Sequence, residues 1–285
     1  IGNPIVTVAR ESYKSFSFTC EDNLGITAWA LLKEARDPVE SEWQEIESIT
    51  PFTGTKEIDS AGEYYFWVRD NQGNKAFAKI ISWNITVNKT VGIEYALAEN
   101  TNILSNFALD NTQAVIHVRV DEHYENLQII ANGINIENDA TVLINKNTVI
   151  DISCTPKTYT VTFDMNGKDL ENQEPAQSIV YLNKVIEPAD HYIKGEYISG
   201  WYKDAELTAT WNFDTDVVQG DITLYAKWDI YNKPTKITIE VPEDNAEVTF
   251  NYYIMQSSKL QIKWDNQEAA VEFIENTDPT DPVLG

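Results

Sequence analysis

Basic residues and cysteine are scarce in this chain of 285 residues, and long apolar runs are missing from it. Lys and Arg number 21 against 45 Asp and Glu, which gives a formal net charge of −24. Affinity for phosphate needs clustered Lys and Arg, so this balance argues against nucleic acid and against an anionic membrane surface as partners. The longest apolar runs, residues 28–32 and 76–83, are strand-sized. We therefore expect no membrane insertion in this part of the protein.

The two cysteines, Cys20 and Cys154, lie far apart in the sequence. Secreted modules often carry paired cysteine frameworks, and a single bridge between these two residues is one interpretation. Two buried free thiols are the other, and it is the one we expect. Neither cysteine has a nearby Cys or His at metal-ligand spacing, which argues against a zinc site.

Helical periodicity is nearly absent, and short alternating runs broken by Asn, Asp and Gly take its place. This pattern predicts a mostly β protein. In residues 114–120 the apolar side chains would face a core, with His117 and Arg119 pointing outward. Helix is expected at most in residues 29–36 and at a turn near 204–208. Strands are predicted at residues 64–69, 92–97, 114–120, 127–131, 141–144, 148–153, 159–164, 222–228, 236–241, 246–252 and 259–264.

Turn clusters and resets of the periodicity divide the chain into four expected domains, residues 1–87, 88–157, 158–229 and 230–285. Each is acidic, so the charge is spread along the chain and not held in a tail. Connections of a few residues predict a semi-rigid array of tandem small domains. Domains of this size bury only about 60% of their unfolded surface. End-to-end contacts between neighbours are therefore expected to stabilise them.

Five blocks between residues 159 and 228 carry the most specific signal. They are Tyr-Thr-Val-Thr-Phe-Asp-Met-Asn-Gly at 159–167, Asn-Lys-Val at 183–185 with Pro188, Gly-Glu-Tyr-Ile-Ser-Gly-Trp-Tyr at 195–202, Trp-Asn-Phe-Asp at 211–214 and Asp-Ile-Thr-Leu-Tyr-Ala-Lys-Trp at 221–228. Their order and spacing resemble the Listeria–Bacteroides repeat, the B-repeat type of internalin B. The resemblance implies a small β-grasp unit carried by a bacterial cell-surface protein. Ile198 stands where the family usually has Phe, and one copy is found where tandem copies are usual.

The aromatic residues of this segment are its only large apolar groups, so we expect them to form its core. They are Trp201, Trp211, Tyr225 and Trp228. An aromatic platform for sugars is the alternative interpretation. The glycines are expected at turns, where a positive φ or a close backbone approach favours glycine. They are Gly167, Gly195, Gly200 and Gly220.

The first segment resembles bacterial Ig-like surface domains in residues 22–26, in Trp43 and in the block at 61–74. Gly62 would begin a strand whose aromatic residues alternate across a sandwich, and Gly73 would permit the turn after it. This block is expected to be scaffold. The functional alternative is a calcium site built from Asp70, Asn71 and Asn74, but this set falls short of the six or more oxygens that calcium takes.

The two remaining segments carry weaker signals of family and function. Residues 88–157 match no family that we name, although their strands suffice for a small sandwich. Residues 230–285 resemble a PKD-type β-domain in Leu-Gln-Ile-Lys-Trp-Asp-Asn at 260–266, where Asp265 replaces the Gly of Trp-Gly-Asp. The chain opens at Ile1 and closes after a linker-like Asp-Pro-Thr-Asp-Pro at 278–282. We interpret it as a fragment of a longer protein.

No catalytic motif is found: there is no Gly-x-Ser-x-Gly, no His-Glu-x-x-His and no phosphate-binding glycine loop. His117 and His123 would need to converge with Asp121 or Glu122 to hold a metal, and His191 lies apart. Carboxylate pairs such as Glu243 and Asp244 are too common among 45 acids to mark a glycosidase. Residues 214–216 resemble the start of an EF-hand loop but lack its Gly and Glu. We expect no enzyme activity, no cofactor and no metal.

These observations favour a non-enzymatic, modular bacterial cell-surface protein, either an adhesin or a spacer that projects a binding surface. We expect it to be secreted and anchored through sequence not present here, with a host or microbial surface protein or glycan as partner. The ligand-binding residues stay open. The alternative is an accessory or carbohydrate-binding region of a secreted glycan-processing enzyme. Two coplanar exposed aromatic side chains on one face would favour that alternative, and a free-standing enzyme is the third hypothesis.

Overall fold

The computed structural model describes residues 2–168, 173–189, 191–193 and 196–230, and the backbone of two short strands, β21 (Lys263–Trp264) and β22 (Gln267–Glu268). The expected fold class is confirmed, because the described residues form several separate β-sheets and only one short 3-10 turn, η1 (Glu40–Glu42). The chain divides into two compact units, Ile1–Lys157 and Thr158–Gly285.

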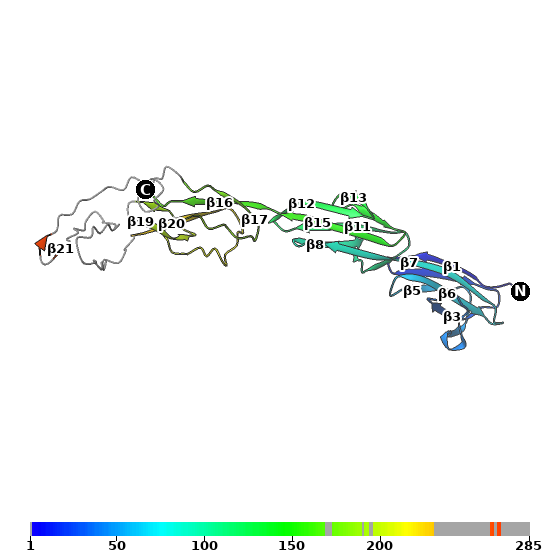
Figure 1. Ribbon diagram of the computed structural model, residues 1–285. Helices are drawn as coiled ribbons and strands as arrows, with labels where there is room; N and C mark the ends of the chain where they lie inside the picture. The colour runs from blue at the N-terminus through cyan, green and yellow to red at the C-terminus, as the bar shows by residue number, and fades with distance from the viewer. Residues whose placement is uncertain are drawn as a thin grey trace. The chain divides into compact units, whose positions relative to one another are not determined.

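The first unit begins with a sandwich of seven strands (Figure 1). One layer holds β1 (Ile5–Arg10), β2 (Ser15–Glu21) and β5 (Phe52–Glu57), and the other follows the order β4 (Gln44–Ile49), β3 (Ile26–Leu32), β6 (Gly62–Asp70) and β7 (Lys75–Lys89). Buried aromatic rings fill the space between the layers, with Phe18 and Phe66 only 4.5 Å apart between ring centroids. Gly62 begins β6 and Gly73 has a φ of +85° in the turn after it, as predicted.

Strand β7 continues from this sandwich into a second one. It pairs with β6 through residues 75–82 and then, at 85–89, pairs in parallel with β15 (Thr148–Pro156). Next to β15 lie β12 (Tyr124–Ala131) and β13 (Ile134–Ile136). The facing sheet has the order β14 (Thr141–Ile144), β11 (Thr112–Val120), β8 (Ile93–Glu99) and β9 (Asn102–Ile103). In β11 the apolar side chains face the core while His117 and Arg119 are exposed, as predicted.

The two sandwiches have separate cores that meet at the joint, where β10 (Phe107–Leu109) pairs with β7. Phe107 and Leu109 pack into the core of the first sandwich, whereas Tyr13 and Trp83 pack against the core of the second. Backbone hydrogen bonds add to this: the N–H of Leu109 donates to the carbonyl of Tyr13 at 2.7 Å. The expected boundary near residue 87 therefore lies within a continuous strand.

The second unit is a five-stranded sheet with the order β17 (Gln177–Val180), β16 (Thr158–Asp164), β20 (Ile222–Ile230), β19 (Glu196–Tyr202) and β18 (Tyr192–Ile193). Strands β16 and β20 pair in parallel, and the other pairs are antiparallel. One face of the sheet carries the core, in which Trp201 and Trp211 are buried and Trp228 packs against the cluster.

Several expectations are corrected. The helix expected at 29–36 is wrong, because residues 29–32 belong to β3, where side chains alternate between the two faces of the sheet. Residues 204–208 form a turn, not a helix. Tyr225 is only partly buried, because it lies between the buried Leu224 and Ala226 and points to the opposite face.

The turn positions predicted for the glycines of the second unit are confirmed only in part. Gly167 has the expected positive φ, of +85°, but Gly200 lies inside β19, next to an irregularity in its pairing with β20. Gly220 has no positive φ and no close neighbour. Gly195 and nearly all of the predicted fourth domain, including the strands expected at 236–241 and 246–252, lie outside the described residues.

Candidate functional site

An aromatic cluster covers the outer face of the sheet β4-β3-β6-β7, on the side away from the sandwich core. Trp43, Tyr65 and Trp67 are buried there, and we call these three residues with Phe77 the outer aromatic cluster. The ring of Phe77 lies 4.6 Å from that of Trp67 and 5.6 Å from that of Tyr65. The Phe77 side chain is 48% exposed. It is the part of the cluster that an approaching molecule would meet.

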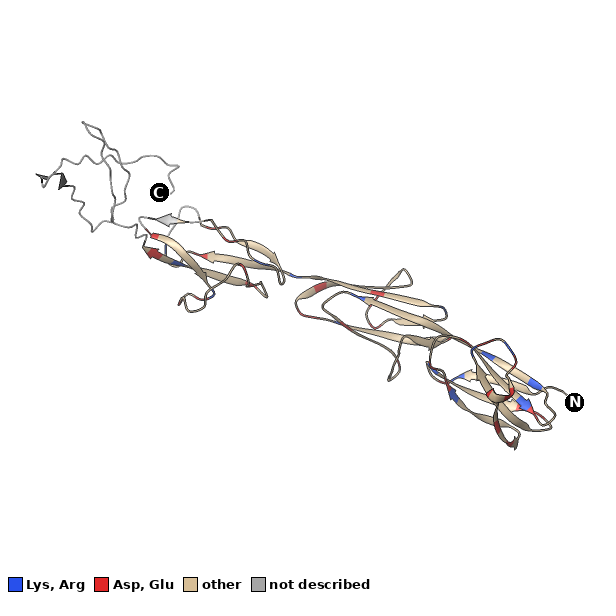
Figure 2. Cartoon of the chain, turned by 60° about the horizontal axis from the view of Figure 1, so that its bottom comes forward, with Lys and Arg blue, Asp and Glu red and all other residues tan. Residues whose placement is uncertain are grey.

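Paired charges surround this cluster. The Arg69 guanidinium lies 4.9 Å from the Trp43 ring centroid and forms ion pairs with Glu40, at 3.0 Å, and with Glu45. Lys79 lies 2.6 Å from Glu63 in a second ion pair. Figure 2 shows that Lys and Arg gather in the first sandwich and occur singly elsewhere. The face is therefore apolar with a small excess of acidic charge at its edge, which suits an uncharged partner better than an anionic one.

A carbohydrate site is expected to show two coplanar, exposed aromatic side chains on one face. Over the described part of the chain, the aromatic side chains exposed by more than a third are Phe77 and Tyr95, at 48% and 40%. They lie on β7 and β8, which belong to different sheets. Trp201 and Trp211, considered as an alternative sugar platform, are buried in the core of the second unit. Among the described residues, the aromatic side chains thus do not form the platform considered as the alternative.

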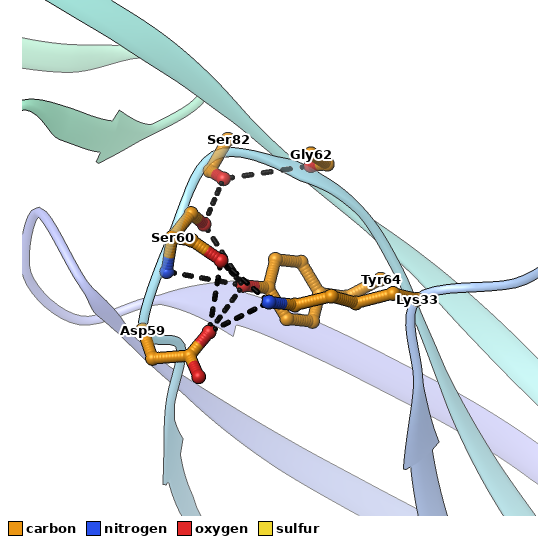
Figure 3. Close-up of polar contacts among 6 residues, drawn as sticks. All are labelled: Lys33, Asp59, Ser60, Gly62, Tyr64 and Ser82. Atoms are coloured by element: carbon orange, nitrogen blue, oxygen red, sulfur yellow. Dashed lines mark hydrogen bonds and ion pairs between the residues drawn. The ribbon is translucent and has the colours of Figure 1, made fainter.

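A polar cluster joins the end of β5 to β6 (Figure 3). The Tyr64 hydroxyl donates to the backbone carbonyl of Ser60 or to Asp59, both at 2.9 Å, and accepts from the Ser60 N–H at 3.2 Å. Lys33 lies 2.9 Å from Asp59, and Ser82 donates to the same Ser60 carbonyl at 2.9 Å. The hydrogen bonds from Lys33, Ser60 and Tyr64 lower the pKa of Asp59 to about 2. The polar groups of this cluster thus bind one another within the first sandwich.

The residues considered for calcium hold a turn instead. Asp70 is 2% exposed, and its carboxylate accepts hydrogen bonds from the backbone of Gln72 and of Asn74, both at 2.8 Å, and from the Asn74 side chain at 2.7 Å. Burial would raise the pKa of Asp70, but these hydrogen bonds lower it below its ordinary value. Both carboxylate oxygens of Asp70 therefore accept hydrogen bonds within the turn. The described residues contain no group of three or more His, Cys, Asp or Glu arranged for a metal.

Each of the three histidines has its own carboxylate neighbour. His117 pairs with Asp139, and His191 lies 3.1 Å from Glu174. His123 lies 3.8 Å from Glu122, next to it in the sequence. The structure thus does not assemble His117 and His123 with acids into one site.

One acid of the EF-hand-like run, Asp216, also stabilises a loop. Asp216 accepts a hydrogen bond from the Asn212 N–H at 3.0 Å and lies 2.9 Å from Lys203. These contacts, the one from Asn212 first, lower the pKa of Asp216. Cys20 and Cys154 are buried free thiols, as expected, and burial raises the pKa of Cys20 to about 12. Glu243 and Asp244 lie outside the described residues.

The outer aromatic cluster was missed by the sequence reasoning, although the sequence carries a signal for it. Residues 64–68 read Tyr-Tyr-Phe-Trp-Val, an unbroken apolar run and not an alternating one. Such runs are typical of strands that are buried on both faces. Tyr64 and Phe66 face the sandwich core, while Tyr65 and Trp67 face the outer cluster.

Comparison with known proteins identifies one part of the chain. Residues 159–227 match the family model of the Listeria-Bacteroides repeat domain, which confirms the resemblance predicted for this segment. The protein called "Putative Gly-rich membrane protein" of Evansella cellulosilytica is 37% identical over 90 residues, which is 32% of this chain and 10% of that protein. A "Putative membrane protein" of the same organism is 39% identical over 74 residues, 26% of this chain and 11% of that protein.

The chain thus spans about a tenth of the length of these two relatives. The repeat and the relatives' names fit a surface-associated, modular protein. Within the described ranges, no helix is long and apolar enough to cross a membrane.

Proposed function

We propose that this chain is a spacer segment of a non-enzymatic, modular bacterial cell-surface protein, secreted and anchored through sequence outside the chain. The observation that carries the proposal is β7, which runs unbroken through two sandwiches whose cores interlock at the joint. A flexible linker at this point would let two domains tumble independently. A shared strand, with side chains exchanged between two adjoining cores, restricts that motion, which is what a spacer requires.

An Ig-like character of the first sandwich supports this assignment. Such sandwiches place a Tyr at the start of the sixth strand whose hydroxyl bonds the backbone a few residues upstream. Tyr64 on β6 makes this contact with Ser60. They also pack a Trp of the third strand against a disulfide, one cysteine of which lies two residues after the Tyr. Here Phe66 takes that position, and Trp29 of β3 stacks on it at 5.9 Å.

The sheet topology of the second unit supports its interpretation as a β-grasp-like module. Its mixed sheet places β16, the first strand, in parallel beside β20 and buries a single core of large apolar side chains on one face. The hydrogen-bonding residues that were considered as sites, such as Asp70 and Asp216, stabilise turns of the scaffold. These contacts favour a structural role over a catalytic one.

Surface labelling of the bacterium that makes the protein tests the proposal. Antibodies against residues 1–157 should label intact cells, and external protease should remove the labelling. Cells lysed before labelling give the total amount of protein for comparison. Labelling that appears only after lysis would contradict the proposed location. Turnover by the purified chain across a panel of glycan and peptide hydrolase substrates would contradict its non-enzymatic character.

The adhesin form of the proposal adds a partner, a surface protein or a glycan. The outer aromatic cluster is the candidate contact, with Phe77 as the ring presented to solvent. Binding of the chain to an array of glycans and extracellular-matrix proteins tests this. We expect Phe77→Ser to abolish a saturable signal, while Tyr95→Ser, on a different sheet, serves as the matched control. Binding that is lost with Tyr95→Ser and kept with Phe77→Ser would place the contact elsewhere.

A further inference from the structure

We propose that the second sandwich and the Listeria-Bacteroides repeat are each closed by a mechanical clamp that resists pulling along the chain. In each of them, the first and the last strand are neighbours and run in parallel. This inference rests on the proposed spacer role, because a spacer between a cell and its target must transmit tension.

The repeat shows the arrangement in its simplest form. Residues 161–164 of β16, its first strand, lie opposite residues 222–225 of β20, its last strand. Tension on the chain pulls the start of β16 in one direction and the end of β20 in the other. Because the strands are parallel, this pull slides one along the other and loads the evenly spaced hydrogen bonds of the ladder together.

Side chains extend this ladder beyond both of its ends. The Oδ1 of Asp221 accepts a hydrogen bond from the Thr160 N–H at 2.7 Å, immediately before the ladder. The Trp228 indole N–H donates to the carbonyl of Met165 at 2.9 Å, immediately after β16. The same two segments are therefore tied by side-chain contacts on either side of their backbone pairing.

The second sandwich repeats the design with different residues. Residues 85–89 of β7 lie opposite residues 148–152 of β15 in parallel. Before the ladder, the Oδ1 of Asn147 accepts from the Asn84 N–H at 3.1 Å. After it, the Thr90 hydroxyl accepts from the Cys154 N–H at 3.1 Å. Two domains without a shared sequence motif thus close in the same way.

Burial protects both ladders. Val161 and Leu224 are 0% exposed in the repeat, and Ile150 is 0% exposed in the sandwich. Backbone hydrogen bonds beside such side chains lie in a low-dielectric environment, where water cannot easily replace them. Forced unfolding is governed by the rate of crossing the unfolding barrier. A ladder that must break as a whole raises that barrier in the pulling direction.

The chain passes from one clamp to the next through a single residue. β15 ends at Pro156 and β16 begins at Thr158, with only Lys157 between them. The path of tension therefore runs through strand β7, its ladder with β15, and then the ladder of β16 with β20. No long connection that would stretch first is present between the two ladders in the sequence.

Single-molecule pulling in two directions tests the clamp of the repeat. The full chain, in a Cys20→Ala and Cys154→Ala background, carries handles at Thr158→Cys and Ile230→Cys for pulling along the strands. A matched protein has handles at Thr158→Cys and Gln219→Cys, which pull the same two strands apart from one end. All three sites are exposed. We expect a several-fold higher rupture force along the strands, with a length gain of about 200 Å. Equal forces would overturn the clamp.

Two further measurements keep the test decisive. Asp221→Ala should lower the force along the strands, whereas Asp214→Ala, an exposed aspartate in a nearby turn, should leave it unchanged; equal effects would contradict the role of Asp221. If the handles disturb folding, pulling the chain by its two ends should give two high-force steps, and their absence would overturn the proposal. The rupture forces are measured independently of surface labelling. The proposed cell-surface location and the proposed clamp can therefore be contradicted separately.

Discussion

The indole N–H of Trp83 donates a hydrogen bond of 2.6 Å to the Oδ1 of Asp110, 27 residues further along the chain. The bond lies at the joint, where β7 leaves the first sandwich and β10 returns to it. It ties the outgoing strand to the segment that supplies Phe107 and Leu109 to the first core. The joint is thus held by side chains from both of the segments that it connects.

Removing this bond should weaken the first unit. We expect Asp110→Ala to lower the free energy of unfolding by about 1–3 kcal/mol, because the bond to a carboxylate is lost and a partly buried indole N–H is left unpaired. Denaturant unfolding followed by tryptophan fluorescence measures the change. Glu47→Ala on the exposed face of β4 is the control and should have little effect. Equal stability of the two variants would show that the bond does not strengthen the joint.

The Tyr64 hydroxyl should contribute more to stability than that of its neighbour. Tyr64→Phe removes the bonds to Ser60 and Asp59 at the corner before β6, and we expect a loss of about 1–2 kcal/mol. Tyr65→Phe removes one bond, to the exposed Glu63 at 2.8 Å, and should cost less. Thermal and denaturant unfolding of both variants gives the comparison. A larger loss for Tyr65→Phe would contradict the assigned role of the corner.

Two glycines with the same backbone angle separate strain from steric clash. Gly92 and Gly133 both have a φ of +83°, but a Cβ on Gly92 would lie 2.5 Å from the Tyr124 ring, whereas nothing lies within 4 Å of one on Gly133. Gly133→Ala should cost about 1–2 kcal/mol for the left-handed conformation alone. Gly92→Ala should cost about 1–3 kcal/mol more, because the ring must move. Equal losses in denaturant unfolding would mean that Tyr124 moves away freely.

Acid should destabilise the first sandwich through two carboxylates. The hydrogen bond from Lys33 is the main cause of a pKa of about 2 at Asp59, and that from Arg36 the main cause of a pKa of about 2 at Glu42. Ordinary values in unfolded chains are about 3.9 for Asp and 4.3 for Glu. A lowered pKa in the folded state adds stability that is present above the unfolded value and is lost as the pH falls toward the folded one.

We therefore expect the free energy of unfolding to fall between about pH 4.5 and pH 2. The double variant Asp59→Asn and Glu42→Gln should show a smaller fall over this interval than the parent protein. Both carboxylates are at the surface, so salt should reduce the difference. Denaturant unfolding at pH 7 and pH 3 measures it, with Glu47→Gln as the control. A double variant with the full parental pH dependence would contradict the assignment.

Much of the local structure could be predicted because it depends on neighbours in the sequence. The alternation in residues 114–120 correctly predicted which side chains of β11 face the core. The turn at Asp70 followed from the conformational freedom of Gly73 and the hydrogen-bonding side chains around it. The helix expected at residues 29–36 was wrong because residues 29–32 are apolar at successive positions, and their periodicity did not distinguish a helix from a strand buried on both faces.

The sequence by itself determined the β class, the Listeria-Bacteroides repeat, the acidic composition and the places of Gly62 at a strand start and Gly73 in a turn, because local chemistry specifies turns and strand faces. The tertiary structure alone decided that β7 serves two sandwiches, that Phe107 fills the core of the first, and that the closing strands pair in parallel. Those features join residues far apart along the chain. Which distant segments meet depends on how whole cores pack, and no local pattern records it.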